Sequence, residues 1–143
     1  HLLPQFGGGP QVLSLAFVRD LAEVTVQCLT HLAAVGETYF VTAPEVVTAR
    51  ELAREIAAQL EVWTLPLSVP TFALWPICAL AQAASCLTGQ PAMLSLHKYP
   101  ELRAPGWVCN PARLREELGL TCPTHLKPGI AATLQWYREQ RWL

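Results

Sequence analysis

The sequence predicts a mainly helical α/β fold with a few short strands, and three observations lead to this prediction. Short β-prone stretches alternate with stretches of helical periodicity over residues 12–60, in the order strand, helix, strand, helix. The length of 143 residues suits one domain with its own core and is too short for two. Hydrophobic residues make up 52% of the chain and charged residues 15%, well below the ~25% usual in soluble domains. We therefore treat residues 1–143 as a single domain whose apolar excess needs a deep core, a lipid surface or a partner.

The first strand and helix follow a glycine-rich turn. Residues 12–18 are β-prone and come directly after Gly-Gly-Gly-Pro. A helix is predicted over residues 20–34, with Asp20 capping its first free amides and Gly36 ending it. The apolar residues at helical spacing in this segment are Leu21, Val24, Cys28, Leu29 and Leu32.

A second strand and helix follow. Residues 37–43 combine aromatic and β-branched side chains, so we predict a strand there, at the edge of a parallel sheet. Thr48 and Glu51 have the spacing of a capping box that starts a helix. The apolar face of this helix consists of Leu52, Ile56 and Leu60.

Residues 62–96 contain no Asp, Glu, Lys or Arg. A strand-like segment at 63–70 leads into a predicted helix at 72–88 that Gly89 stops. A spanning helix wants ~20 mainly apolar residues, and this one contains Pro76. Core packing or the wall of an apolar substrate site is the favoured interpretation, with peripheral membrane contact as the alternative and true spanning last.

Three helical segments complete the chain. The first, at 94–102, is interrupted by Pro100. The second runs from a cap at Asn110 to a stop at Gly119, with proline at its first position. The third begins near Pro128 and reaches the end. Its aromatic residues Trp136 and Tyr137, with Trp142, are expected to pack the last helix onto the domain.

Several of these segments, in this order, resemble the extended short-chain dehydrogenase/reductases, the NAD-dependent epimerase/dehydratase superfamily. Residues 18–22, Val-Arg-Asp-Leu-Ala, resemble the family segment in which a strand feeds a helix. Residues 37–42 and 48–52 resemble the next strand and helix. Residues 107–119 resemble the helix that ends in Leu-Gly, and residues 129–137 resemble the closing helix with its Trp-Tyr pair.

The resemblance implies the carboxy-terminal, substrate-binding part of such an enzyme, with the cofactor-binding amino-terminal Rossmann half absent. The similarity is greatest to the dihydroflavonol-reductase-like and 3β-hydroxysteroid-dehydrogenase-like branches, whose substrates are often flat and hydrophobic. Leu13 stands where the sugar-nucleotide epimerases carry a phosphate-binding arginine, which disfavours a nucleotide-sugar substrate. The candidate substrate-lining residues are Leu13, Ser14, Phe17, Met93, Leu94 and Arg103.

The residues that carry the family's chemistry are not found in this sequence. A dinucleotide site needs a glycine-rich turn that opens a helix, whereas Gly7–Gly9 is followed by Pro10 and a strand. The family's catalytic tyrosine has a lysine four residues on. The residues four places after Tyr39, Tyr99 and Tyr137 are Ala43, Arg103 and Arg141. We therefore expect no catalytic and no cofactor-binding residue here, with NAD or NADP bound by the rest of the parent protein.

Other function classes have little support. The net charge of −1 offers no basic stripe for nucleic acid. The five cysteines form no Cys-x-x-Cys pair, and His31, His97 and His125 lack ligand spacing, so no metal site is predicted. We expect a cytoplasmic protein with reduced cysteines, possible peripheral membrane contact, a small-molecule substrate, and self-association through the unpaired strand edge. A non-catalytic binding module or a membrane-surface module is the alternative.

Overall fold

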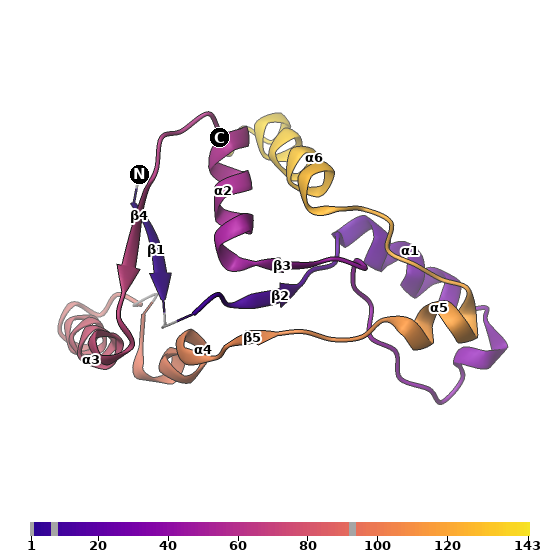
Figure 1. The fold of residues 1–143 in the computed structure, drawn as a ribbon, viewed down its shortest axis with the longest axis horizontal. Coiled ribbons are helices and arrows are strands. Elements are labelled where there is room, and N and C mark those ends of the chain that lie inside the picture. Colours follow the sequence, from indigo (N-terminus) through magenta and orange to yellow (C-terminus); the bar gives the residue numbers. More distant parts are fainter. Residues whose placement is uncertain (1, 7–8, 92–93) are drawn as a thin grey trace.

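The computed structural model describes residues 2–6, 9–91 and 94–143, which form a mainly helical α/β fold with few short strands, as predicted (Figure 1). The strands are β1 (Leu2–Phe6), β2 (Val12–Ser14), β3 (Val46–Thr48), β4 (Leu65–Val69) and β5 (Gly106–Trp107). The α-helices are α1 (Val18–Cys28), α2 (Ala49–Gln59), α3 (Thr71–Thr88), α4 (Tyr99–Arg103), α5 (Ala112–Leu118) and α6 (Leu126–Glu139). Two 3-10 turns are η1 (Leu32–Ala34) and η2 (Leu96–Lys98).

The strands form two small sheets. In one, β2 lies in the centre, antiparallel to β3 and parallel to β5. In the other, β1 and β4 pair in parallel. Gly106 has a φ of 151°, and a Cβ there would lie 2.1 Å from the Val12 carbonyl oxygen. The pairing of β5 with β2 therefore requires glycine at this position.

The strand predicted at 37–43 is not present. The segment makes one backbone hydrogen bond to the β2–α1 connection, from Ala43 to Leu15 at 2.7 Å, and the Thr42 hydroxyl donates to the same carbonyl at 2.8 Å. A ladder needs a neighbouring strand along its whole length, and β2 pairs with Val46–Thr48 instead. The free edges of the three-stranded sheet are accordingly those of β3 and β5.

The start of α1 also corrects a prediction. The helix begins at Val18 with Phe17 at the N-cap, and it ends at Cys28, before the predicted limit. Asp20 lies inside the first turn and is buried, so it does not cap. Its carboxylate accepts hydrogen bonds from the N–H and the hydroxyl of Thr124, both at 2.8 Å. Asp20 thereby fastens the segment that precedes α6 onto α1.

Two of the other helix signals are confirmed and two differ from the prediction. The Thr48–Glu51 capping box forms, and Gly89 ends α3 in the left-handed conformation. The first difference is at α5, where Pro111 occupies the N-cap instead of the first helical position, and the side chain of Asn110 accepts from the N–H of Ala112. The second difference is Pro100, which lies in the first turn of α4 and does not interrupt a helix, as suits a residue with no N–H to donate.

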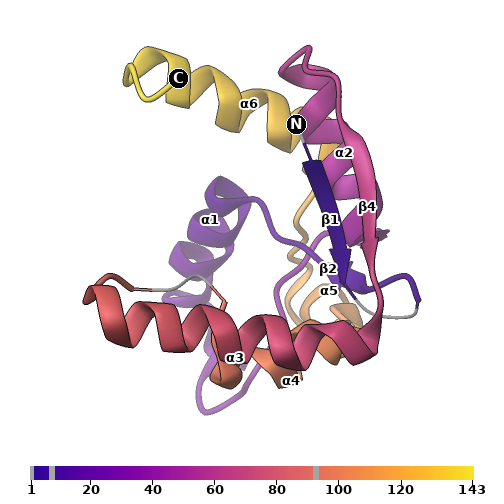
Figure 2. The same cartoon turned by 90° about the vertical axis from the view of Figure 1, so that its left-hand side faces the viewer.

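The helices occupy three places around the sheet (Figures 1 and 2). At one end of the molecule, α1 and α5 enclose the main core of Val24, Leu114, Leu118 and Cys122. At the other end lie α3 and α4, which pack against one another. Between these ends, α2 and α6 lie side by side above β3 and β2.

Helix α3 is the one helix of the described residues that is long and apolar enough to cross a membrane, and 11% of it is buried in the protein. Its buried residues are Leu74 and Cys78. The structure therefore leaves most of an apolar helix in contact with the surroundings.

Candidate functional site

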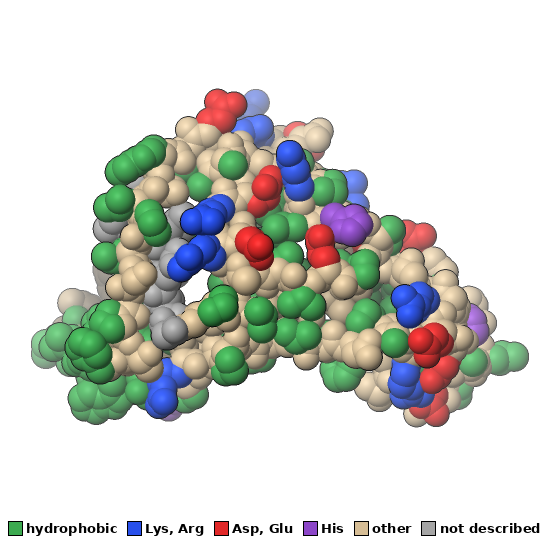
Figure 3. Space-filling view, viewed as in Figure 1, with side chains coloured by type: hydrophobic (Ala, Val, Ile, Leu, Met, Phe, Trp, Pro, Cys, Tyr) green, Lys and Arg blue, Asp and Glu red, His purple; other side chains and the backbone are tan. Residues whose placement is uncertain are grey.

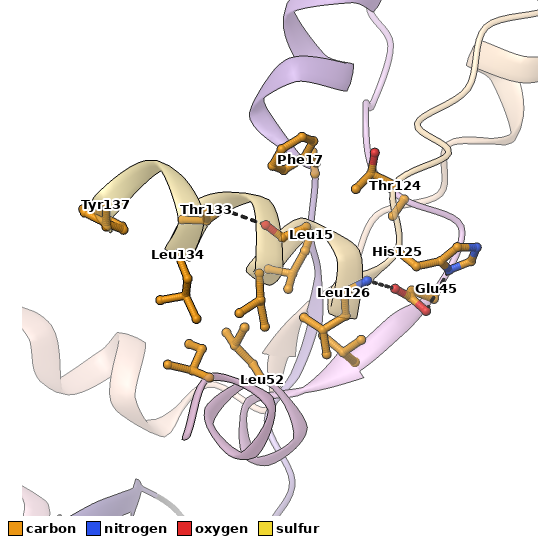
Figure 4. Close-up of a pocket in the computed structure, with 16 residues that line it drawn as sticks. Leu15, Phe17, Glu45, Leu52, Thr124, His125, Leu126, Thr133, Leu134 and Tyr137 are labelled. Carbon is orange, nitrogen blue, oxygen red and sulfur yellow. Dashed lines mark hydrogen bonds and ion pairs between the residues drawn. The ribbon is translucent and has the colours of Figure 1, made fainter. Parts of the chain in front are cut away.

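An apolar cavity of about 360 Å³ lies between α2, α6 and the segment that joins β2 to α1 (Figure 4). This volume falls within the ~300–1,000 Å³ range of small-molecule sites. The residues that line it from the two helices are Leu52, Ile56, Leu126, Gly129, Ile130, Thr133, Leu134 and Tyr137. The remaining lining residues are Leu15, Ala16, Phe17, Ala43, Glu45, Val47, Thr124 and His125.

Helical periodicity explains why these side chains meet. Leu52 and Ile56 are four residues apart on α2, and Ile130 and Leu134 are four apart on α6, so each pair forms a stripe along one helix face. The two stripes face each other across the cavity, and Phe17 covers it from the start of α1 (Figure 4). Leu134 is 8% exposed and Ile56 is 37% exposed. Thr133 of α6 is also exposed, so each helix wall contributes a solvent-accessible position to the cavity.

A pair formed by Glu45 and His125 stands at the rim. The Glu45 carboxylate lies 3.0 Å from His125 Nδ1 and also accepts a hydrogen bond from the N–H of Leu126. The hydrogen bonds from His125 and Leu126 hold the pKa of Glu45 below its ordinary value. The imidazole of His125 points away from the apolar side chains (Figure 4). The pair fixes the beginning of α6 and leaves the interior of the cavity apolar.

The two threonine hydroxyls on the walls have hydrogen-bond partners within the protein. Thr133 donates to the Gly129 carbonyl at 2.8 Å, and Thr124 donates to Asp20. An incoming polar group would find these hydrogen bonds already made, so the walls offer it little compensation for lost water. The interior therefore suits an apolar ligand or the apolar part of a larger one.

The arrangement holds no catalytic constellation among the described residues. Tyr137 contributes its ring at one end of the cavity, where it lies 5.7 Å from the ring of Trp142. Trp136 and Trp142 are 42% and 68% exposed. The prediction that the three aromatic residues pack the last helix down is thus wrong for these two, because α6 packs through Leu134 and Ile130 instead.

The predicted lining residues fall into two separate groups. Of these, Phe17 lines the cavity, whereas Leu13 is a half-buried residue of the central strand and pairs with Val47 and Trp107. The hydroxyl of Ser14 exchanges hydrogen bonds with the backbone of Cys109.

The second group lies near α3 and α4. Leu94 is half-buried beside η2, and exposed Arg103 lies over the ring of Tyr99 at 5.4 Å. Met93 lies outside the described residues. The structure therefore does not bring the two groups together around the cavity beside α2.

Sequence reasoning missed Glu45, His125 and most of the α6 wall. Glu45 and His125 are far apart in the chain, and neither belongs to a recognisable motif. The stripes Leu52–Ile56 and Ile130–Leu134 were recognisable as apolar helix faces, but periodicity does not say which two faces meet. Pairing α2 with α6 needed the tertiary structure.

No group of three or more metal-ligating side chains occurs within the residues that the structure describes. His31 lies outside α1, contrary to the prediction, and its buried Nδ1 has no hydrogen-bond partner there. All five cysteines are free, with Cys78 and Cys122 buried and Cys86 exposed. Burial raises the pKa of the Cys122 thiol, which disfavours its reactive thiolate form.

The described glycines offer no cradle for a dinucleotide. Gly9, the described member of the glycine-rich loop, opens no helix, and space is free around its Cα. At Gly106 the backbone and side chain of Val12 occupy the space next to the Cα, so no ligand can approach there. Among the described glycines, none therefore stands at the start of a helix with free backbone, which is the arrangement that a dinucleotide site uses.

Comparisons with known proteins identify a structure with a similar fold, and they do not assign the chain to a family. No family model matches the chain, and no curated protein is significantly similar to it. A solved structure, the crystal structure of gox2253, superposes with a TM-score of 0.64 at 15% identity and covers 97% of this chain. The match covers 48% of the gox2253 chain, so this chain spans about half the length of that protein. At this identity the likeness concerns the fold alone.

Proposed function

We propose that this chain is the carboxy-terminal, substrate-side portion of an NAD- or NADP-dependent oxidoreductase of the extended short-chain dehydrogenase/reductase type. The observation that carries the proposal is the apolar cavity between α2 and α6, whose two threonine hydroxyls are hydrogen-bonded within the protein. Such a cavity suits a small apolar compound that carries one hydroxyl or carbonyl group outside the apolar walls.

Two further observations support the proposal. The segments that resemble the reductase family extend over nearly the whole chain, from residue 18 to residue 137. The fold also matches about half of a longer solved chain, which is the relation expected of one portion of a two-part protein. The partner portion would be a dinucleotide-binding half, and the protein would be cytoplasmic.

Within this proposal the chain binds and orients the substrate, and the other half supplies hydride chemistry. The walls of Leu52, Ile56 and Ile130 exclude water from the apolar part of the substrate. The described tyrosines have no lysine four residues on, so this chain by itself is catalytically silent. Self-association is expected through the free edges of β3 and β5.

The proposal is tested on the natural protein that contains this chain. Turnover of small apolar aldehydes, ketones and alcohols is followed with NADH, NADPH and their oxidised forms. Ile130→Trp fills the cavity and should raise KM for the apolar substrate by about tenfold or more, the equivalent of ~1.4 kcal/mol, with the KM for the nucleotide unchanged. Ala131→Trp, on the exposed side of the same helix, is the matched control.

Two results would contradict the proposal. The first is the absence of nicotinamide-dependent turnover with every apolar substrate tried. The second is a gene in which no glycine-rich strand–turn–helix sequence precedes the codon for His1. Ligand binding without turnover would then favour the alternative, a non-catalytic binding module.

A further inference from the structure

The exposed apolar surface of β4 and α3 is a second feature, separate from the cavity. We define the α3 patch by its exposed side chains, which are Trp63, Leu65, Phe72, Trp75, Leu80 and Leu87. Figures 1 and 2 place β4 and α3 on the same side of the molecule, and Figure 3 shows hydrophobic side chains gathered at that end. No charged residue occurs between Val62 and Leu96. We propose that the α3 patch inserts into the surface of a lipid bilayer.

The breadth of the apolar face favours lipid over a protein partner. With about 100° between successive residues of a helix, the exposed side chains from Trp75 through Phe72 to Ile77 extend around more than half of α3. A helix that packs on protein needs an apolar stripe of roughly 100°. The face of α3 that carries Leu74 and Cys78 already packs on the rest of the protein, because both side chains are 1% exposed. A bilayer surface can cover the whole of the remaining exposed face of α3, which is broader than such a stripe.

The polar side chains of α3 are arranged for an apolar environment. The hydroxyl of Thr88 donates to the Ala84 carbonyl at 2.8 Å, and that of Ser85 donates to the Gln90 carbonyl. The side-chain oxygen of Gln82 accepts from the N–H of Leu96 at 3.0 Å. These bonds lower the free-energy penalty of moving the groups out of water.

The geometry indicates that the helix lies in the membrane surface and does not cross it. The hydrogen bond from Leu96 to Gln82 brings the chain after Gly89 back beside the middle of α3. Helix α4 and η2 also pack along α3. A helix fastened along one side can immerse its opposite face only, as interfacial helices do.

Charges beside the patch complement a lipid headgroup. Next to α3, Lys98 forms an ion pair with Glu101 at 2.9 Å, and exposed Arg103 adds one further positive charge. Long basic side chains at a membrane surface keep their charge among the headgroups while their stems contact lipid. Trp63 and Trp75 belong to the residue type that concentrates at this depth.

The test is co-sedimentation of the full chain with phosphatidylcholine–phosphatidylserine vesicles. The wild type should pellet with the vesicles. The double variant Phe72→Ser/Leu80→Ser should lower the partition coefficient by about tenfold or more, since burying each side chain favours the apolar phase by ~1.5–3 kcal/mol. The matched control Leu29→Ser/Leu32→Ser removes two equally exposed leucines from the α1–η1 region and should leave partitioning within about twofold.

A second measurement locates the contact. Brominated lipids should quench the fluorescence of Trp63 and Trp75, so the double variant Trp63→Phe/Trp75→Phe should lose the quenching that Trp142→Phe retains. The proposal is overturned if the wild type stays in solution at low salt, or if the Phe72/Leu80 variant pellets like the wild type. It is also overturned if that variant abolishes dimers in light scattering while vesicles bind neither protein, because a second copy then covers the patch. None of these outcomes depends on nicotinamide-dependent turnover.

Discussion

The two ends of this molecule use similar side chains in opposite ways. At the α1–α5 end, Val24, Leu114, Leu118 and Cys122 are at most 6% exposed and form a core from α1, α5 and the segment after α5. At the α3 end, Phe72, Leu80 and Leu87 are more than 70% exposed on a helix without charges. The first end is completed by its own chain, whereas the second needs something outside it. This contrast separates residues that hold the fold from residues available for association.

The largest effect should appear where the chain completes its own core. Leu114→Ala removes a side chain that is 1% exposed, and we expect a loss of about 2–5 kcal/mol in the free energy of unfolding. Leu80→Ala makes the same change on exposed α3 and should alter stability by less than about 0.5 kcal/mol. Urea denaturation measures both. Equal losses would show that the two ends do not differ as described.

The next effect concerns the tether between α1 and the start of α6. Asp20→Ala removes a buried carboxylate that accepts two hydrogen bonds from Thr124, and we expect a loss of about 2–3 kcal/mol. Glu23→Ala, on the exposed face of the same helix, is the control and should be nearly neutral. Thermal unfolding of both variants measures the two losses in stability. A neutral Asp20→Ala would mean that the tether contributes nothing to stability.

A smaller effect is expected at the start of α2, one wall of the cavity. Thr48→Ala breaks the capping box and should cost about 1 kcal/mol. Thr25→Ala makes the same change in the middle of α1, where alanine is the better helix former, and should be neutral or slightly stabilising. The urea concentrations at the midpoints of unfolding compare the stabilities of the two variants. A loss at Thr25 as large as that at Thr48 would argue against a specific capping role.

The smallest effect should depend on pH. The pKa of Glu45 is lower in the folded protein than its ordinary value, because His125 and the Leu126 N–H bond to the carboxylate. Its contribution to stability is therefore complete above the ordinary glutamate pKa and is lost as pH falls through the folded-state value. Glu45→Gln should be less stable than the wild type near neutral pH and equal to it in acid. A stability difference that persists unchanged in acid would contradict this assignment.

Local signals in the sequence predicted much of the fold. The Thr48–Glu51 box, the Gly89 stop and the Gly119 stop depend on neighbouring residues, and all three formed as expected. The failures involve distant partners. Asp20 has the residue type of a helix cap, yet its partner is Thr124, and the β-prone segment 37–43 has no strand beside it. Composition and periodicity carry no information on such pairings.

In the candidate site, too, local features were predictable from the sequence and contacts between distant residues were not. The faces of α2 and α6 were visible as apolar repeats, but their meeting, and the Glu45–His125 pair at the rim, arise from tertiary contacts. Among the residues expected to line a substrate site, Phe17 reaches this cavity. The apolar character of the α3 region was evident from the absence of charge, whereas its exposure was not.

The central claim is that this chain binds the apolar part of a substrate and leaves the nucleotide to another part of the protein. Calorimetric titration of the isolated chain with NAD, NADP and a small apolar ketone tests it directly. The account predicts heat of binding for the ketone, abolished by Ile130→Trp, and none for either nucleotide. Micromolar binding of NAD or NADP by this chain would contradict it.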